Sequence, residues 1–498
     1  EMLRSLVGSE MCIRDSIYIE EKTMPAHGSD LQDATHYDLI IVGTGSGNSI
    51  LTPDFDDKNI AIVEKGAFGG TCLNVGCIPT KMYVLAAEQA YAAREARKLG
   101  IDLEYKGADW PGIVERVFDN RIDLIAKGGE DYRRNGCPNV TVYDLEARFV
   151  GPKTLLTGRG GTEELITADT VILAAGARPF IPEWAHDVTF HTNEDIMRLE
   201  RQPKSLTIVG GGFIAMEFAH VFDALGTEVT IISRSQLLRQ LDQDLAEPFN
   251  KLADERYTVH IGRTVSSASE DSDGVTLTLD DGTTVTSEAL LIATGRIPNS
   301  DTLDVAAAGI ETHEDGRVAV DEFGRTTAEG VWALGDLSSP YQLKHVANAE
   351  QRAVTHNVLK AWAGEDDSTM VPMPHDHVPS AIFTHPQIAT VGMTEREAVD
   401  AGFDVTVKLQ NYGDVAYGWG LEDSSGVVKL VADRQSGQLL GAHYMGPQAS
   451  TLIQQMITVL AYGLDLRDFP RSQYWIHPSL AEVTENAILG LDLTFKEV

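Results

Sequence analysis

Residues 37–48 read Tyr37-Asp38-Leu39-Ile40-Ile41-Val42-Gly43-Thr44-Gly45-Ser46-Gly47-Asn48. A short apolar run that ends in closely spaced glycines predicts a buried strand, a tight turn and then a helix. Such a unit holds the pyrophosphate of a dinucleotide at the helix N-terminus, because glycine lets the backbone approach closely. Gly43, Gly45 and Gly47 are therefore candidate cofactor-binding residues. Asn48 stands where a third glycine is usual, which predicts slightly looser packing of helix against strand.

A second stretch of the sequence has the same order of an apolar run, closely spaced glycines and a predicted helix. Residues 206–215 read Leu206-Thr207-Ile208-Val209-Gly210-Gly211-Gly212-Phe213-Ile214-Ala215, and a helical stretch follows. A single fingerprint of this kind is weakly specific, whereas two that lie a domain's length apart predict two dinucleotide-binding units. Gly210, Gly212, Phe213 and Ile214 are the candidate contacts of the second unit.

Each unit also has a predicted closing strand. Residues 170–176 run into Arg178-Pro179, and residues 290–295 run into Arg296 through a glycine, Gly295, that we expect to contact the cofactor. Period-two alternation within residues 254–290 predicts a meander or hairpin. After Pro379, strand-like runs alternate with helices, which is typical of an α+β domain.

The two units are predicted to hold different nucleotides. Glu64 ends the second strand of the first unit, 21 residues past Gly43. A carboxylate there accepts hydrogen bonds from an adenosine ribose with free hydroxyls, as in FAD or NAD. In the second unit the matching strand has no acidic residue at its end, and Arg234 and Arg239 follow. Guanidinium groups fit a 2′-phosphate, which indicates NADPH, unless both arginines are solvated loop residues.

Two cysteines indicate redox chemistry. Cys72 and Cys77 lie in the segment Gly69-Gly70-Thr71-Cys72-Leu73-Asn74-Val75-Gly76-Cys77-Ile78-Pro79-Thr80-Lys81. A regular helix does not bring cysteines at this spacing into easy disulfide geometry, so we expect a distorted segment. A strained, accessible pair is typically catalytic rather than structural. Lys81 adds positive charge near the thiols and favours a thiolate.

Composition excludes several classes of protein. The chain has 498 residues with 40 basic and 74 acidic side chains, a net charge of −34, which argues against nucleic acid or an anionic membrane as partner. No apolar run approaches the ~20 residues of a membrane helix. Four cysteines exclude a secreted disulfide framework and predict a cytoplasmic protein. The histidines around residue 376 lack further ligands, so no metal site is predicted. Residues 1–35 lack signal-peptide features and are expected to be a non-native or disordered leader.

Taken together, the two fingerprints, the dithiol, Gly335-Asp336 and residues 477–482 resemble the flavin-dependent pyridine nucleotide–disulfide oxidoreductases, the family of glutathione reductase and dihydrolipoamide dehydrogenase. The match is collinear from Tyr37 to about Gly490. Within the family the chain resembles the mycothione reductase subfamily. The strings that carry this finer resemblance include residues 43–51, 79–82, 129–134, 343–348, 412–419 and 473–478.

The resemblance implies an NADPH-dependent flavoprotein that reduces mycothione to two mycothiol molecules through FAD and a Cys72–Cys77 disulfide. The alternatives are a dihydrolipoamide dehydrogenase that runs in the opposite direction with NAD, and a glutathione-type reductase. A further alternative is a flavoprotein that serves as the dehydrogenase component of a large complex.

The resemblance also implies residue roles at the dithiol. Cys72 is the thiol that exchanges with substrate, and Cys77 is the thiol that faces the flavin. Lys81 lies near flavin N5 and pairs with Glu217, and Phe213 is an aromatic gate over the nicotinamide pocket. Further FAD contacts are Gly70, Thr71, Ala147, Asp336 at the ribitol, and Lys344, which begins a helix pointed at the flavin pyrimidine.

The other implied chemical site is His477 with Glu482. Histidine can protonate a leaving thiolate near neutral pH, and a carboxylate would orient the imidazole. In the family this histidine comes from the partner subunit, which implies an obligate homodimer. The expected fold is α/β, with two Rossmann-like domains and a C-terminal α+β dimerisation domain. The expected segments are 36–186 for FAD, 187–300 for NADPH, 301–376 as a central FAD-contacting region and 377–498 for the interface.

Overall fold

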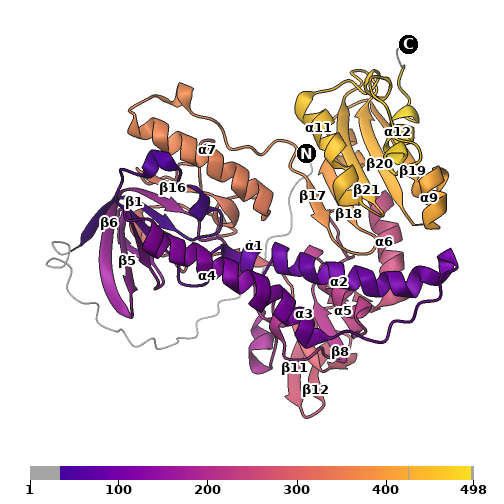
Figure 1. Ribbon diagram of the computed structural model, residues 1–498, viewed down its shortest axis with the longest axis horizontal. Coiled ribbons are helices and arrows are strands. Elements are labelled where there is room, and N and C mark those ends of the chain that lie inside the picture. The colour runs from indigo at the N-terminus through magenta and orange to yellow at the C-terminus, as the bar shows by residue number, and fades with distance from the viewer. Residues whose placement is uncertain (1–33, 424, 495–498) are drawn as a thin grey trace, which may run out of the picture.

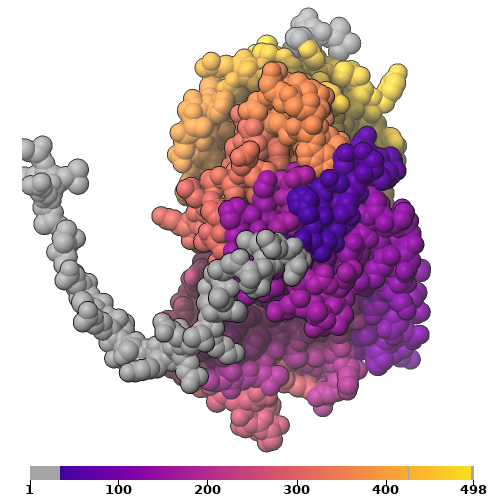
Figure 2. Space-filling view, turned by 90° about the vertical axis from the view of Figure 1, so that its left-hand side faces the viewer, coloured from indigo at the N-terminus to yellow at the C-terminus, as the bar shows by residue number. Residues whose placement is uncertain are grey.

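The computed structural model describes residues 34–423 and 425–494. Figure 1 shows three β-sheet regions, with the first sheet at the left, the second unit at the lower right and the C-terminal sheet at the upper right. The side view in Figure 2 shows the same order, with the C-terminal residues uppermost and the second unit at the bottom. The predicted leader lies outside the described residues, apart from its last two positions.

The first sheet has seven strands in the order β3-β2-β1-β6-β5-β4, with β16 paired to β6. β1, β2, β3 and β16 run parallel with the C-terminal half of β6, while β4 and β5 are antiparallel. The strands are β1 Thr35–Val42, β2 Ile60–Val63, β3 Val140–Tyr143, β4 Arg148–Gly151, β5 Thr154–Arg159, β6 Thr162–Leu173 and β16 Val331–Ala333. Apolar residues of β1 and β2 are buried on both faces, as a covered parallel sheet requires.

The helix predicted after the first fingerprint is wrong. Only 3₁₀ turns, at Gly47–Ser49 and Pro53–Phe55, lie between β1 and β2. A long helix, α7 (Lys344–Trp362), packs on this face instead, with Val354 and Val358 in the same cluster as residues of β1. α7 thus covers the face of β1 that a helix after the first fingerprint would cover.

The second unit forms a parallel sheet in the order β10-β9-β8-β14, followed by the predicted antiparallel meander β11-β12-β13. Its strands are β8 Ser205–Val209, β9 Glu228–Ser233, β10 Thr258–Ile261, β11 Val265–Asp271, β12 Gly274–Leu279, β13 Thr284–Ser287 and β14 Ala289–Ile292. The helix predicted after the second fingerprint is confirmed as α5 (Phe213–Ala224). The exit strands β7 (Ala177–Pro179) and β15 (Arg296–Pro298) pair with each other, which joins the two units.

The C-terminal sheet is antiparallel, in the order β17-β18-β21-β20-β19. Its strands are β17 Ser380–Ile382, β18 Ile388–Gly392, β19 Val405–Asn411, β20 Val427–Asp433 and β21 Leu439–Met445. The remaining helices are α1 Gly70–Asn74, α2 Cys77–Glu95, α3 Trp110–Val117, α4 Asp123–Asp131, α6 Gln243–Arg256, α8 Glu395–Asp400, α9 Ala416–Leu421, α10 Ala449–Leu452, α11 Gln454–Tyr462 and α12 Ala481–Leu489. In the described part of the chain, no helix combines the length and the apolar character needed to span a bilayer.

A buried charge cluster ties the second unit to the C-terminal sheet. Lys429 of β20 donates to Asp242, Asp244 and Glu395 over 2.8, 2.6 and 2.6 Å. The side chains of Lys429 and Asp242 are both only 3% exposed. Asp242 also caps α6 by accepting from the backbone N of Asp244. Three carboxylates from two segments, the start of α6 and the start of α8, therefore share one ammonium group.

We expect Lys429→Met to destabilise the protein strongly. Removing one partner of a buried ion pair leaves an uncompensated charge, which costs about 3–5 kcal/mol. Thermal unfolding followed by circular dichroism measures the effect, with Lys251→Met on the exposed side of α6 as the matched control. A melting temperature equal to that of the control would show that the cluster contributes nothing to stability.

Candidate active site

The two cysteines lie at a break between helices. Cys72 belongs to α1 and Cys77 opens α2. Gly76 sits in the break, and a Cβ there would lie 2.9 Å from the carbonyl oxygen of Thr71. Asn193 donates from Nδ2 to the carbonyl oxygen of Val75 at 2.9 Å and so holds the break from outside. The distortion expected from the spacing is confirmed, and both cysteines are free thiols.

The two thiols are electrostatically unequal. A hydrogen bond from Cys77 lowers the pKa of Cys72 to about 7, and the charge of Lys344 lowers it further against the effect of burial. The same bond raises the pKa of Cys77. Cys72 is therefore the thiol that ionises first, as an attacking nucleophile must.

Lys81 and Glu217 form no direct ion pair among the described residues, and their expected pairing stays a prediction. Lys81 Nζ lies 3.0 Å from the centroid of the Phe383 ring, in a cation–π contact. Glu217 Oε1 accepts from the backbone N of the same Phe383 at 2.9 Å. Lys81 and Glu217 also influence each other's pKa through space, and both contact Phe383. Sequence reasoning missed Phe383, because nothing local marks it as a neighbour of α2.

Burial makes the carboxyl of Glu217 a weaker acid than an exposed glutamate. Desolvation raises the pKa of its carboxyl to about 7, against the lowering effects of the Phe383 amide and of Lys81. This carboxyl can therefore gain or lose a proton near neutral pH. A group with that property beside a dithiol is typical of a functional site.

The first fingerprint forms a close-packed turn. Gly43 has φ +100°, and a Cβ there would lie 2.3 Å from the carbonyl oxygen of Ala174. Glu64 lies at the end of β2 as expected, and its Oε2 accepts from Thr44 N at 2.9 Å and Thr44 Oγ1 at 2.6 Å. The ribose contact of Glu64 stays a prediction. Arg133 donates to the Oδ1 of Asn48 and to its backbone oxygen, each at 2.8 Å, and the looser packing expected from Asn48 stays a prediction.

The remaining FAD candidates lie in α1, just before β4, and at the start of α7. A Cβ on Gly70 would lie 2.7 Å from Gly45 Cα, so the turn and α1 are in contact. Thr71 is half-buried beside Cys72, and Ala147 is buried. α7 begins at Lys344 as predicted.

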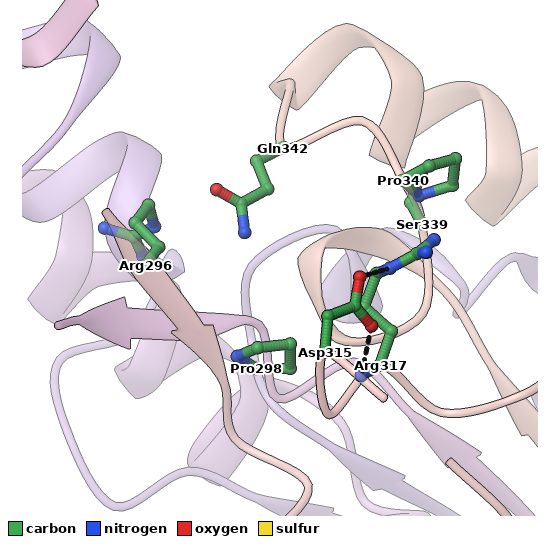
Figure 3. Close-up of a pocket in the computed structure, with 7 residues that line it drawn as sticks. All are labelled: Arg296, Pro298, Asp315, Arg317, Ser339, Pro340 and Gln342. Atoms are coloured by element: carbon green, nitrogen blue, oxygen red, sulfur yellow. Dashed lines mark hydrogen bonds and ion pairs between the residues drawn. The ribbon is translucent and has the colours of Figure 1, made fainter. Parts of the chain in front are cut away.

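Asp336 follows β16 and is half-buried. Burial raises the pKa of its carboxyl, while Arg296, with Nε 3.9 Å from Asp336 Oδ2, and Lys344 lower it. Arg296 also borders a cavity of about 160 Å³, shown in Figure 3 with Gln342 on one side and the Asp315–Arg317 pair on another. Ligand pockets have about 300–1,000 Å³, so this cavity alone is not a ligand site.

The backbone of the second glycine fingerprint also closely approaches a neighbouring segment of the chain. Gly210 has φ +142°, and a Cβ there would lie 2.2 Å from the carbonyl oxygen of Ala293. Gly212 precedes α5, while Phe213, 38% exposed, and Ile214 begin it. The later glycine, Gly295, has φ +138°. Beyond β9, Arg234 and Arg239 are both exposed.

The histidine site is formed as the sequence implies. His477 Nδ1 lies 2.7 Å from Glu482 Oε1, and the histidine side chain is 69% exposed. The neighbouring Tyr474 and Ile476 are also exposed. In Figure 1, α12, which carries Glu482, lies far from α1, which carries Cys72. The imidazole therefore does not meet the dithiol of its own chain.

Within the described ranges, no group of three or more His, Cys, Asp or Glu side chains could hold a metal ion. His375, one of the histidines around residue 376, lies 2.6 Å through Nε2 from Oε1 of the buried Glu350.

Comparisons with known proteins decide the family. Residues 37–353 match the pyridine nucleotide-disulphide oxidoreductase family, and residues 378–488 match its dimerisation domain. The chain belongs to this family. It is a disulfide oxidoreductase, and its cofactors are FAD and NAD(P)H.

Individual proteins that resemble this chain support the family assignment. A mycothione reductase of Mycobacterium tuberculosis is 53% identical over 91% of this chain and 99% of its own length. A dihydrolipoyl dehydrogenase of Halobacterium salinarum is 33% identical over 91% of this chain and 96% of its own length. The structure of an HOCl-induced flavoprotein disulfide reductase, RclA, from Escherichia coli superposes with a TM-score of 0.79 at 26% identity, covering 91% of this chain and all of that one. These similarities confirm the α/β fold and the disulfide chemistry expected from the sequence.

Proposed function

We propose that this oxidoreductase is an NADPH-dependent mycothione reductase that works as a homodimer in the cytoplasm. The observation that carries the reaction type is the hydrogen-bonded Cys72–Cys77 pair, in which one thiol has a pKa near neutrality. The substrate rests on the 53% identity with a mycothione reductase over nearly the whole chain. The cytoplasmic assignment rests on the low cysteine content.

The residues fit both cofactors chemically. The glycine turns leave no room for side chains where a pyrophosphate approaches, and Glu64 ends β2 with two acceptor oxygens. We assign FAD to residues 43–48 together with Glu64, Gly70, Thr71, Ala147, Asp336 and Lys344. When bound, FAD passes two electrons from the nicotinamide to the disulfide form of the dithiol. We keep the segment boundaries 36–186, 187–300, 301–376 and 377–498 as part of this proposal.

The chain's own residues then reduce the substrate. Cys72, as thiolate, attacks one sulfur of the substrate disulfide, whose S–S bond breaks to leave a mixed disulfide and a thiolate. The partner subunit's His477 gives that thiolate its proton, with Glu482 holding the imidazole in place. Cys77 gives its proton to the partner subunit's His477, now neutral, and attacks the Cys72 sulfur, which forms the internal disulfide and expels the second thiolate. The same imidazolium then protonates that thiolate to the second thiol.

Anaerobic NADPH oxidation with mycothione, oxidised glutathione and lipoamide in parallel tests the substrate. We expect rapid turnover with mycothione alone. Preference for oxidised glutathione or for lipoamide would overturn the proposal that mycothione is the substrate. Lipoamide is the more informative of the two, because a dihydrolipoyl dehydrogenase is among the relatives.

We expect the double variant Arg234→Ala, Arg239→Ala to lose its preference for NADPH over NADH. A charge-assisted bond to a phosphate contributes about 1.5–3 kcal/mol, so KM for NADPH should rise by at least about tenfold while KM for NADH changes little. Steady-state kinetics with both nucleotides measure this, with Arg263→Ala as the control, because the Arg263 side chain of the same unit pairs with Asp281 at 3.0 Å instead. An unchanged KM for NADPH would mean that both arginines are ordinary solvated residues.

A further inference from the structure

The first glycine turn ends without the helix expected after it, and its backbone hydrogen bonds stop at Asn48. The two carbonyl oxygens before Asn48 each accept from the backbone N three residues further on, at 3.1 Å. In an α-helix the next carbonyl, that of Asn48, would accept from the backbone N of residue 52. Thr52 is extended instead, with φ −98° and ψ 172°. The carbonyl of Asn48 therefore lacks the donor that a helix would supply.

Arg133 supplies the donor from another segment. Its Nη2 donates to the backbone oxygen of Asn48, and its Nε donates to Asn48 Oδ1, each at 2.8 Å. The guanidinium is a rigid planar fork, so two bonds to one residue fix the orientation of that residue as well as its distance. The third nitrogen, Nη1, lies 3.7 Å from Cys137 Sγ. All three nitrogens of Arg133 thus have protein partners.

Arg133 is anchored to the same sheet as the turn it holds. It lies in η6 (Tyr132–Gly136), a π-helical turn that directly continues α4. Such turns are rare and occur frequently at functional sites. η6 packs on β3, a strand of the first sheet, while Asn48 lies 85 residues earlier in the chain. The arginine therefore connects the end of the glycine turn to a rigid part of the same unit.

α7 holds the turn through other residues. Lys344 Nζ donates to Ser46 Oγ at 2.9 Å, and that hydroxyl donates in turn to Asn348 Oδ1 at 3.1 Å. Gln351 Nε2 donates to the carbonyl oxygen of Ser49 at 3.0 Å. α7 thus fixes residues 46 and 49, whereas Asn48 between them is fixed by Arg133.

We propose that Arg133 is a positioning residue for FAD, which holds Asn48 and so keeps the backbone of residues 43–48 in the shape that binds the pyrophosphate. This inference rests on the proposed assignment of FAD to that turn. The guanidinium takes over the work of the missing helix, and Asn48, in the place of a third glycine, supplies the second acceptor. Binding sites need their groups held to within about 0.5 Å, so a turn released at Asn48 binds FAD less tightly.

The test is a double-mutant cycle between Arg133 and Asn48, with the dissociation constant of FAD as the readout. Serial dilution of each holoenzyme releases FAD, and flavin fluorescence reports the free fraction. We expect Arg133→Met to raise Kd by at least about tenfold, because hydrogen bonds to a charged group are lost. Asn48→Ala should raise Kd less, since the carbonyl bond remains. Added to Arg133→Met, it should change Kd by less than about twofold, because no guanidinium is left to bind.

Arg121→Met, at an exposed arginine of the preceding π-helical turn η5 (Phe118–Ile122), is the matched control and should leave Kd unchanged. If Arg133→Met does not fold, Arg133→Gln replaces it, since an amide keeps one donor but cannot form the fork. An unchanged Kd in the Arg133 variants would overturn the proposal. Independent effects of the Arg133 and Asn48 substitutions would overturn it as well, because they would mean that the arginine supports the structure elsewhere.

Glu64→Gln separates this inference from the assignment on which it rests. If residues 43–48 and Glu64 bind FAD, this variant also raises Kd, and an unchanged value would overturn the FAD assignment together with the role of Arg133. A raised Kd in Glu64→Gln with an unchanged Kd in Arg133→Met would overturn the role of Arg133 alone. The measurement contains no disulfide and no nicotinamide nucleotide, so its result is independent of whether mycothione is the substrate.

Discussion

Cys72→Ser should lose reduction of every disulfide by at least about a thousandfold, because serine can neither attack a disulfide nor form one with Cys77. The variant should keep its flavin and still oxidise NADPH with a small quinone acceptor, since that reaction does not need the dithiol. NADPH consumption with mycothione and with the quinone, measured on the same preparation, separates the two reactions. Cys137→Ser, at a cysteine outside the redox segment, is the matched control.

Retained disulfide reduction in Cys72→Ser would contradict the dithiol mechanism. Loss of both reactions together would instead indicate damage to the flavin site. The difference between the disulfide reaction and the quinone reaction is therefore as informative as the size of the loss in disulfide reduction.

His477→Gln should lower kcat for mycothione reduction by about 10²- to 10⁴-fold, the usual contribution of a general acid. The effect should be confined to the step that uses the disulfide, so reduction of the enzyme by NADPH in stopped-flow absorbance stays at its normal rate. Glu482→Gln should be less severe, because it weakens the orientation of the imidazole and leaves the acid in place.

His313→Gln is a suitable control, since His313 is exposed and lies in the central segment. Equal slowing of the NADPH step in His477→Gln would show that the histidine supports the structure of the flavin site rather than the chemistry of the leaving thiol.

The sequence predicted those parts of the molecule that depend on local geometry. The first glycine of each fingerprint, Gly43 or Gly210, lies where the backbone approaches the carbonyl that follows a neighbouring strand. The break between Cys72 and Cys77 and the contact of His477 with Glu482 also follow from short-range spacing. Such features depend on steric limits or on residues a few positions apart, which a single sequence records.

Features formed by distant segments were not predictable in the same way. The helix expected after Gly47 is absent because α7, almost 300 residues later, occupies that face of the sheet. Phe383, which follows β17, contacts both Lys81 of α2 and Glu217 of α5, although it lies far from both in the sequence. The bond of Lys344 with Ser46 likewise joins segments that no local pattern relates. In each case tertiary packing determined the outcome.

Mixing two inactive variants tests the central claim, that Cys72 of one subunit and His477 of the other form a single reducing site. Cys72→Ser and His477→Gln chains are co-expressed with different tags, so that random pairing gives about half heterodimers. Each heterodimer contains one site with both groups intact and one with neither. The account predicts mycothione reductase activity of about a quarter of the unmodified enzyme in the mixture, concentrated in the doubly tagged fraction. No activity in that fraction would contradict it, because a site formed within one chain cannot be restored by pairing.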